Sequence, residues 1–265
     1  MGKQIKGVDY PKYVNHEYFN ELNTEKKLYL LGLIYADGSI VKPKGNKQKN
    51  LRLVLQEDDK DIVEEFCKET TIGREMKIYN PPSVSSRGWK KKAFFSFSSD
   101  KICNKLIELG CLINKSAVGM SFDFSNLTER QVAHFIRGFF DGDGCCYVKL
   151  VKNRYKRKTT YILKRNFKSK LSKRVTVACS SESFLKEILK MLQKFCNLTS
   201  KPLWNNRLRK EMVYVLSIEG QEDVQKIKEF FYKDATIFMK RKFDKFNMSI
   251  KSQAENGFSE GLETT

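Results

Sequence analysis

The sequence predicts an α+β fold built from two units that share one order of elements: helix, two strands, helix, two strands, helix. The motif "LLGLIYADG" at Leu30–Gly38 returns as "IRGFFDGDG" at Ile136–Gly144, 106 residues later. After each copy, strand patterns and amphipathic helix patterns alternate in the same order. The 265 residues suffice for two units of ~130 residues. We expect a pseudo-twofold monomer with units at 1–118 and 119–250 and a flexible tail at 251–265.

The first unit begins with a helix over residues 23–38. Asn23 or Thr24 is its expected N-cap, and Gly38 is expected to end it. Two strands joined at Gly45-Asn46 follow, because apolar residues alternate on both sides of that turn signal. An amphipathic helix, a second strand pair and a third helix complete the unit. These later elements are expected at 39–45, 49–56, 58–70, 75–79, 92–99 and 100–110.

The second unit repeats this order. Its first helix spans residues 126–144, with a cap near Thr128 and a stop at Gly144. A long basic stretch separates the first two strands, and two amphipathic helices enclose the second strand pair. These later elements are expected at 145–153, 171–179, 181–195, 201–208, 211–218 and 221–233.

The composition indicates a polyanionic partner. The formal net charge is +19, from 50 Lys+Arg against 31 Asp+Glu, and the basic residues cluster along the chain. An excess of this size is typical of nucleic-acid-binding proteins. No apolar run is long enough to span a membrane. The seven cysteines form no C-x-x-C pair, so we expect reduced thiols in an intracellular, reducing compartment such as the cytoplasm or an organelle matrix.

Each motif carries small residues four apart. These are Gly32 and Ala36 in the first copy and Gly138 and Gly142 in the second. On a helix this spacing forms one flat stripe, which lets another helix backbone approach closely. A glycine-tolerant core helix is the simpler interpretation of one such stripe. Because the stripe occurs twice in one chain, we expect the two motif helices to pack against each other.

An aspartate precedes the terminating glycine in both motifs. Asp37 and Asp143 stand where a helix carries partial negative charge, so each carboxylate is disfavoured by ~0.3–1 kcal/mol. Pairing the helices would also bring the two like charges together, and a divalent cation would reverse that penalty. Two carboxylates suit Mg²⁺, or another divalent cation such as Mn²⁺, with water and phosphate oxygens as further ligands. On a basic protein this predicts metal-dependent phosphodiester cleavage.

The two motifs resemble those of the LAGLIDADG homing endonucleases of the single-chain, two-motif type. The resemblance covers nearly the whole chain, and it implies two saddle-shaped antiparallel sheets that lie in the DNA major groove. It further implies that the motif helices form the interface, that Asp37 and Asp143 bind the metals, and that cleavage of both strands leaves 3′ overhangs. The sixth motif position, Tyr35 in one copy and Asp141 in the other, varies in the family and is not counted as a metal ligand.

The resemblance also implies a lysine after the last helix of each unit. Lys115 fits this place in the first unit and Lys240 in the second, with Lys242 as a nearby alternative. Such a lysine stabilises developing phosphate charge or polarises the attacking water. A simple surface contact to phosphate is an equally good interpretation of each one. Gln56, at the end of a strand, is expected to order water, and Ser180 is a weaker match in the second half.

Basic residues on the predicted strands form the expected DNA-binding surface. Residues 149–174 alone hold twelve basic residues and no acid. A two-stranded ribbon fits the major groove, where lysines mainly hold phosphates and arginines read base edges. Since the two halves differ in their strands, the double-stranded DNA target should be long and asymmetric. The expected contacts are Lys42, Lys44, Lys47, Arg52, Arg87, Arg154, Arg165, Lys168, Arg174, Arg207 and Arg209.

Two alternatives stay open on the same fold. The protein is either a site-specific endonuclease or a binding module: an RNA maturase for its host intron, or a DNA-binding protein that does not cut. Intact Asp37 and Asp143 favour the enzyme, although maturases can retain both acids.

Overall fold

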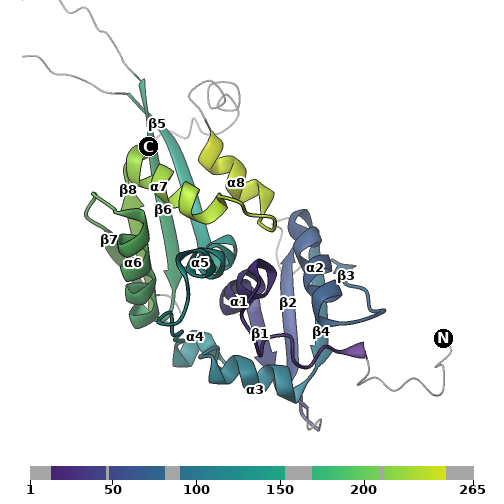
Figure 1. Ribbon diagram of the computed structural model, residues 1–265. Coiled ribbons are helices and arrows are strands. Elements are labelled where there is room, and N and C mark those ends of the chain that lie inside the picture. Colours follow the sequence, from purple (N-terminus) through teal and green to yellow (C-terminus); the bar gives the residue numbers. More distant parts are fainter. Residues whose placement is uncertain (1–12, 46–47, 81–89, 153–168, 209–211, 249–265) are drawn as a thin grey trace, which may run out of the picture.

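The computed structural model describes residues 13–45, 48–80, 90–152, 169–208 and 212–248, and it contains two units around a central helix pair (Figure 1). The expected tail at 251–265 lies outside the described residues. The first unit holds helices α1 (Glu25–Asp37), α2 (Lys60–Thr70), α3 (Asp100–Glu108) and α4 (Lys115–Val118), and a short 3-10 helix at Glu57–Asp59. Its strands are β1 (Gly38–Val41), β2 (Asn50–Gln56), β3 (Lys77–Tyr79) and β4 (Lys92–Ser98).

The second unit has the same architecture. Its helices are α5 (Glu129–Asp143), α6 (Glu182–Cys196), α7 (Gln221–Tyr232) and α8 (Lys240–Asn247). Its strands are β5 (Gly144–Lys152), β6 (Ser169–Cys179), β7 (Leu203–Leu208) and β8 (Met212–Glu219). The two sheets are antiparallel, with orders β1-β2-β4-β3 and β5-β6-β8-β7, so their topologies are the same. The predicted α+β fold with two repeated units is therefore confirmed.

Alternation along the strands gives each sheet a buried face and an open face. In the first sheet Leu51, Leu53 and Leu55 of β2 face the core, while Arg52 between them is exposed. Strand β4 alternates in the same way, with Phe95 and Phe97 buried. Period-two patterning places all apolar side chains of a strand on one side. Helices cover these inner faces, so the outer faces remain available to a partner (Figure 1).

The helices α1 and α5 pack closely at the centre of the molecule (Figure 1). A Cβ atom added to Gly32 would lie 2.0 Å from the carbonyl oxygen of Phe135. A Cβ atom on Gly138 would lie 2.0 Å from the carbonyl oxygen of Tyr29, so the contact is reciprocal. Backbone approach at this distance is possible only without side chains. The predicted pairing of the motif helices is therefore present, and the glycines permit it.

A buried arginine joins the two units on the same helix pair. Arg137 of α5 is fully buried and forms an ion pair with Glu25 of α1 at 2.6 Å. The arginine also donates to the backbone carbonyls of Phe231 and Ile237 and contacts Nδ1 of His134 at 3.0 Å. Glu25 in turn accepts from the backbone N–H of Thr236 at 2.8 Å. Breaking a buried ion pair is costly because it leaves a buried charge without a partner, so this contact fixes α1 against the second unit.

Two short helices, α4 and α8, were not among the predicted elements. Helix α4 has four residues, too few to show a helical period in the sequence. Helix α8 has the sequence KRKFDKFN, and it buries only Lys242 and Phe246. Its apolar stripe is therefore too thin to stand out among the basic residues. Both helices lie at the end of their unit and carry the lysines described below.

The helix caps agree with the sequence. Thr24 caps α1 by accepting from the backbone N–H of Lys27, and Thr128 forms a capping box with Gln131 on α5. Capping of this kind satisfies backbone N–H groups that the first turn leaves unbonded. The caps fix where each central helix begins, and therefore where its last residue is delivered. No helix in the described part of the chain is long and apolar enough to cross a membrane.

Candidate active site

Two carboxylates meet at one end of the central helix pair. Asp37 is the last residue of α1 and Asp143 is the last residue of α5, and each is followed by the glycine that begins a strand. A Cβ atom added to Gly142 would lie 2.9 Å from Oδ2 of Asp37, so this carboxylate reaches the last turn of the other helix. Close helix packing thus brings together two acids that are 106 positions apart in the chain.

The electrostatics of the two acids reflect this proximity. Burial raises the pKa of Asp143 to about 6, and the negative charge of Asp37 adds to the rise. Burial also raises the pKa of Asp37, while Lys242, Lys115, Arg241 and Lys92 counteract it with their positive charges. Both aspartates remain exposed at the molecular surface, so neighbouring groups surround them but leave them accessible to solvent. A site that disfavours two adjacent anions is suited to a cation.

Two lysines hold the ends of the central helices. Lys115 donates from Nζ to the carbonyl oxygens of Ile34 at 2.6 Å and Ala36 at 2.7 Å. Lys242 donates to the carbonyls of Phe140, Gly142 and Gly144, the last at 2.5 Å. The last carbonyls of a helix have no partner within the helix, and a cation there also offsets the negative end of the dipole. Each lysine therefore stabilises the turn that presents an aspartate.

Burial lowers the pKa of both lysines, and nearby negative groups oppose the effect. For Lys115 these groups are the carboxylates of Asp143 and Asp37, and for Lys242 they are those of Asp141 and Asp37. Lys242 is buried and Lys115 is partly buried. Neither lysine therefore matches a plain surface contact to phosphate. In this geometry, the positive charges of the two ammonium groups offset the negative charges of the two carboxylates.

Of the two candidate lysines in the second unit, the alternative Lys242 is the one that bonds to the end of α5. Lys240 begins α8 and is exposed, whereas the alternative Lys242 reaches the end of α5. Successive helix residues turn by about 100°, so residues two apart point to nearly opposite sides. Lys242 shares the buried side of α8 with Phe246, one turn further on. Without α8 in view, the sequence offered no way to choose between the two lysines.

The strand register places Gln56 and Ser180 at matching positions. Gly38 pairs with Leu53 and Gly144 pairs with Val177, so Gln56 and Ser180 each stand three residues beyond the partner of the motif glycine. Gln56 pairs with Lys92 in the sheet and is partly buried. Ser180 donates from Oγ to the carbonyl oxygen of Lys115 at 3.4 Å. Ser180 thus contacts the segment that carries the lysine of the other unit.

Position six of each motif anchors its helix through hydrogen bonds to both units. Asp141 is fully buried and accepts from the hydroxyl of Tyr29 at 2.8 Å and from the backbone N–H of Met239 at 2.7 Å. Tyr35 takes the corresponding place and donates to the carbonyls of Leu109 and Ser121. Burial raises the pKa of Asp141 to about 6, against hydrogen bonds that favour its charged form. Its carboxylate is engaged in the protein interior, away from any cation at the surface.

Four of the expected DNA contacts lie on described surface. Arg52 is exposed on the outer face of the first sheet, and its guanidinium lies 5.6 Å from the centre of the Phe94 ring. Lys42 and Lys44 are exposed just after β1. Arg174 is exposed on the second sheet, forms an ion pair with Glu219 at 3.2 Å and lies over the ring of Tyr147.

The remaining expected contacts have no described side chain. Arg207 lies within β7, and Lys47, Arg87, Arg154, Arg165, Lys168 and Arg209 lie outside the described residues. Two basic residues of the first sheet were not among the expected DNA contacts. Lys77 on β3 and Lys92 on β4 share the outer face with Arg52, because Lys77 pairs with Phe94 and Lys92 with Gln56. Lys92 lies two residues before Phe94 on the same strand, and this even spacing was the signal available in the sequence.

The described part of the site offers a cation the carboxylates of Asp37 and Asp143. Among the residues that the structure describes, no three His, Cys, Asp or Glu side chains cluster as a metal site would require. All seven cysteines are free thiols, and six of them are buried. A hard cation held by two carboxylates completes its shell with water and substrate oxygens. This donor set fits Mg²⁺ or Mn²⁺ with a phosphate group and does not fit structural zinc.

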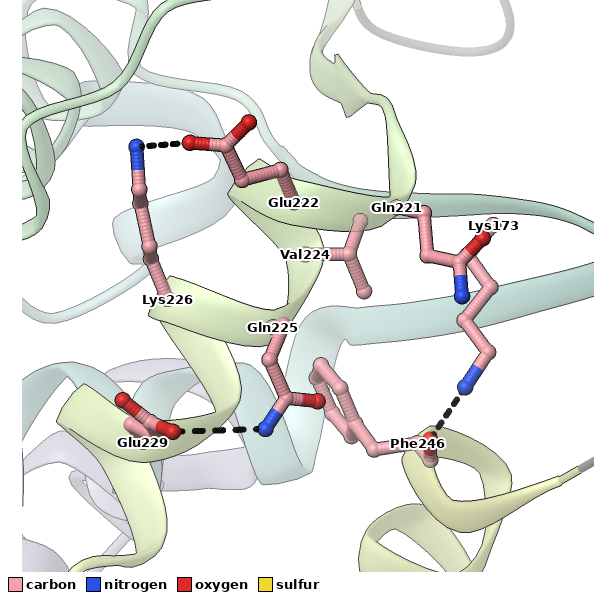
Figure 2. A pocket seen from close by; sticks show the side chains of 8 residues that line it. All are labelled: Lys173, Gln221, Glu222, Val224, Gln225, Lys226, Glu229 and Phe246. Atoms are coloured by element: carbon pink, nitrogen blue, oxygen red, sulfur yellow. Dashed lines mark hydrogen bonds and ion pairs between the residues drawn. The ribbon is translucent and has the colours of Figure 1, made fainter.

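A separate hollow lies between β6, α7 and α8 (Figure 2). Its volume is about 470 Å³, and none of its lining residues belongs to the carboxylate site. Lys226 pairs with Glu222 at 2.8 Å, and Lys173 donates to the backbone carbonyl of Phe246. Gln225 donates to Glu229. Because these polar groups bond to one another, the hollow lacks the converging charges of the carboxylate site.

Several solved structures have this architecture, and one family profile matches part of the sequence. The profile of the LAGLIDADG endonuclease family matches residues 136–251. The homing endonuclease I-WcaI, solved bound to its DNA recognition sequence, is 16% identical with a TM-score of 0.53; the match covers 92% of this chain and 95% of that one. The LAGLIDADG meganuclease I-AabMI, bound to uncleaved DNA, is 14% identical with a TM-score of 0.52, over 87% and 91% of the two chains.

A third solved structure is similar to this chain to about the same degree. The I-SmaMI LAGLIDADG homing endonuclease, bound to cleaved DNA, is 15% identical with a TM-score of 0.50, over 88% of this chain and 91% of that chain. At these identities the likeness establishes a shared fold. No curated protein matches the sequence.

Proposed function

We propose that this chain is a site-specific LAGLIDADG homing endonuclease that makes a double-strand break in DNA, because the LAGLIDADG endonuclease profile matches residues 136–251 and the fold is that of solved LAGLIDADG homing endonucleases. One observation carries the proposal: Asp37 and Asp143 stand together at one end of the central helices, each with a raised pKa. That placement has a structural cost, which a bound cation and a phosphate would remove.

Asp37 and Asp143 are the residues that would hold a divalent cation. When bound, the cation supplies an activated water and neutralises charge on the cleaved phosphate. The protein's own part is to present the two carboxylates in their anionic form. Lys115 and Lys242 support this, because their positive charges lower the pKa of both aspartates against the effect of burial.

The lysines also hold the geometry of the site. Their bonds to the last carbonyls of α1 and α5 fix the turns from which the aspartates project. Preorganised charge of this kind acts in the transition state without reorganisation at the moment of reaction. Gln56 and Ser180, at matching strand positions, would order water beside the two aspartates.

The outer faces of the two sheets would bind the DNA. Arg52, Lys77 and Lys92 give the first sheet a basic outer face. The second sheet differs, since its outer face pairs Arg174 with Glu219 and exposes Tyr147. Because the two faces present different groups, the target would be long and asymmetric. One chain would bind it as a monomer, and cleavage would leave 3′ overhangs.

A cleavage selection tests the proposal. The full chain is incubated with a randomised double-stranded DNA library and Mg²⁺, and the cut ends are captured and sequenced. The expected result is one long, asymmetric consensus with a cut in each strand. A chain that binds one DNA sequence tightly and cuts none would be a DNA-binding protein instead. Preferential binding of its host intron RNA without cleavage would favour a maturase.

A further inference from the structure

The acid Asp59 stands at the start of α2 but does not cap that helix. It occupies the N-cap position, yet its side chain makes no hydrogen bond to the backbone of the first turn. Its side chain is only 3% exposed. A buried carboxylate without a partner is strongly destabilising, and an aspartate at an N-cap usually bonds to its own helix. The position of Asp59 therefore requires another partner.

That partner comes from the other unit. Arg241 of α8 donates from Nε to Oδ1 and Oδ2 of Asp59 at 3.0 and 2.9 Å, and its Nη2 lies 2.8 Å from Oδ2. Two guanidinium nitrogens thus hold one carboxylate, which fixes orientation as well as distance. Arg241 directly precedes Lys242, the lysine that holds the end of α5. The first unit therefore grips the helix that delivers the lysine of the second unit.

The contact has no charged counterpart on the other side of the site. By strand register Asp59 corresponds to Ser183, and by their contacts Lys242 corresponds to Lys115, which places Asn114 opposite Arg241. Neither residue can form an ion pair. The link between the units there is a neutral bond, from Ser180 to the carbonyl of Lys115 at 3.4 Å.

The two lysines also divide between the aspartates. Lys242 bonds to the carbonyls of Gly142 and Gly144 on either side of Asp143, whereas Lys115 bonds to those of Ile34 and Ala36 just before Asp37. The site therefore has two corners. One combines Asp143, Lys242 and the Asp59–Arg241 pair, and the other combines Asp37, Lys115 and Ser180.

We propose that Asp59 is a positioning residue that acts through Arg241 to hold Lys242 in place, that only the Asp143 corner depends on this ion pair, and that the two corners serve different strands in double-strand cleavage. The proposal rests on the endonuclease function proposed above. Loss of the pair should therefore slow the cutting of one strand and convert the enzyme toward a nickase.

Strand-resolved kinetics test the proposal. A target duplex labelled differently on each strand is cut under single-turnover conditions by the wild type, Asp59→Asn and Asp58→Asn. Asp58 is the matched control, because it adjoins Asp59 but forms an exposed pair with Lys90. For Asp59→Asn we expect one strand to be cut about tenfold more slowly, as for other residues that support a ligand from behind, and the nicked duplex to accumulate. Asp58→Asn should keep the wild-type strand ratio.

The strand ratio is independent of folding. Both strands are cut by the same molecules, so a smaller folded fraction lowers both rates equally. An unchanged ratio in Asp59→Asn would overturn the proposal. Arg241→Lys should shift the ratio in the same direction, because lysine keeps the charge but cannot grip both oxygens.

A second measurement does not need DNA. The free protein is acetylated with acetic anhydride, and the labelling of Lys242 is quantified against that of Lys115 by peptide mass spectrometry. We expect Asp59→Asn to raise the labelling of Lys242 several-fold relative to Lys115, and Asp58→Asn to leave it unchanged. Equal labelling in all three proteins would refute the positioning role. A wild type that cuts no DNA would instead refute the endonuclease function, and the labelling would still decide the positioning role.

Discussion

Asp37 and Asp143 each place a negative charge at the negative end of a helix, beside the other acid. We expect Asp37→Asn and Asp143→Asn each to abolish double-strand cleavage while specific DNA binding persists, because an amide is a poor ligand for a hard cation. Gel-based cleavage and binding assays with Mg²⁺ check this. A normal cutting rate in either variant would show that the carboxylate is not a metal ligand.

The same acids should weaken the metal-free fold at neutral pH. Burial raises the pKa of Asp143 to about 6, so the folded state binds its proton more tightly than the unfolded state. The resulting contribution to stability is present below the ordinary carboxyl pKa of about 4 and is lost as pH rises through about 6. Asp143→Asn should therefore melt at a higher temperature than the wild type at pH 8, with chelator present. The gain should vanish near pH 4, and a gain that is equal at both pH values would contradict this explanation.

Lys242 and Lys240 form a natural matched pair. Lys242→Met removes three bonds to the end of α5 and leaves those carbonyls buried, which should cost about 2 kcal/mol in the free energy of unfolding. Lys240→Met changes an exposed residue and should stay within about 0.5 kcal/mol of the wild type. Urea unfolding measures both. Equal losses would mean that α8 itself, rather than Lys242, supports the site.

At the scale of elements, the contact between α1 and α5 decides the geometry of the site. Alanine normally improves a helix by about 1 kcal/mol relative to glycine. Gly32→Ala should do the opposite, because the new methyl group would lie 2.0 Å from a backbone oxygen of the other helix. We expect a net loss of about 1–3 kcal/mol, measured by urea unfolding, together with a loss of cleavage.

Gly45→Ser provides a reference for the glycine substitution. Gly45 adopts a positive φ of 72°, and a Cβ atom there meets no other atom within 4 Å. A loss at Gly45 would therefore reflect backbone strain alone, and cleavage by the folded protein should be unchanged. A stabilised Gly32→Ala variant would show that the two helices can separate without loss.

The whole molecule presents two unlike sheet faces to its partner. Lys77→Ala should weaken DNA binding almost equally for all sequences and lower the slope of log K against log salt by about 0.9, the value for one phosphate contact. Lys101 is the control, because it is an exposed lysine on α3 that pairs with Glu17. Binding titrations at several salt concentrations compare the two variants. Equal slopes would place the DNA elsewhere than on the outer face of the first sheet.

Much of the fold could be predicted because each element carries its own local signal. Alternation along β2 and β4, the caps at Thr24 and Thr128 and the small residues of the motifs depend only on nearby residues. Helices α4 and α8 lacked such a signal, and for that reason the sequence could not rank Lys240 against Lys242. A helix of one or two turns is stabilised by packing rather than by its own pattern.

The sequence by itself determined the two repeated units, the two acids that end the motif helices and the basic character of the chain. Periodicity, capping and charge are properties of neighbouring residues, so they can be read without coordinates. Only the tertiary structure decided which lysine holds α5, that Asp141 is buried against Tyr29 and Met239, and that Asp59 pairs with Arg241. These contacts join residues about 100 to 180 positions apart in the chain. They form because the two glycine-lined helices approach closely, and burial and charge then determine which side chains pair.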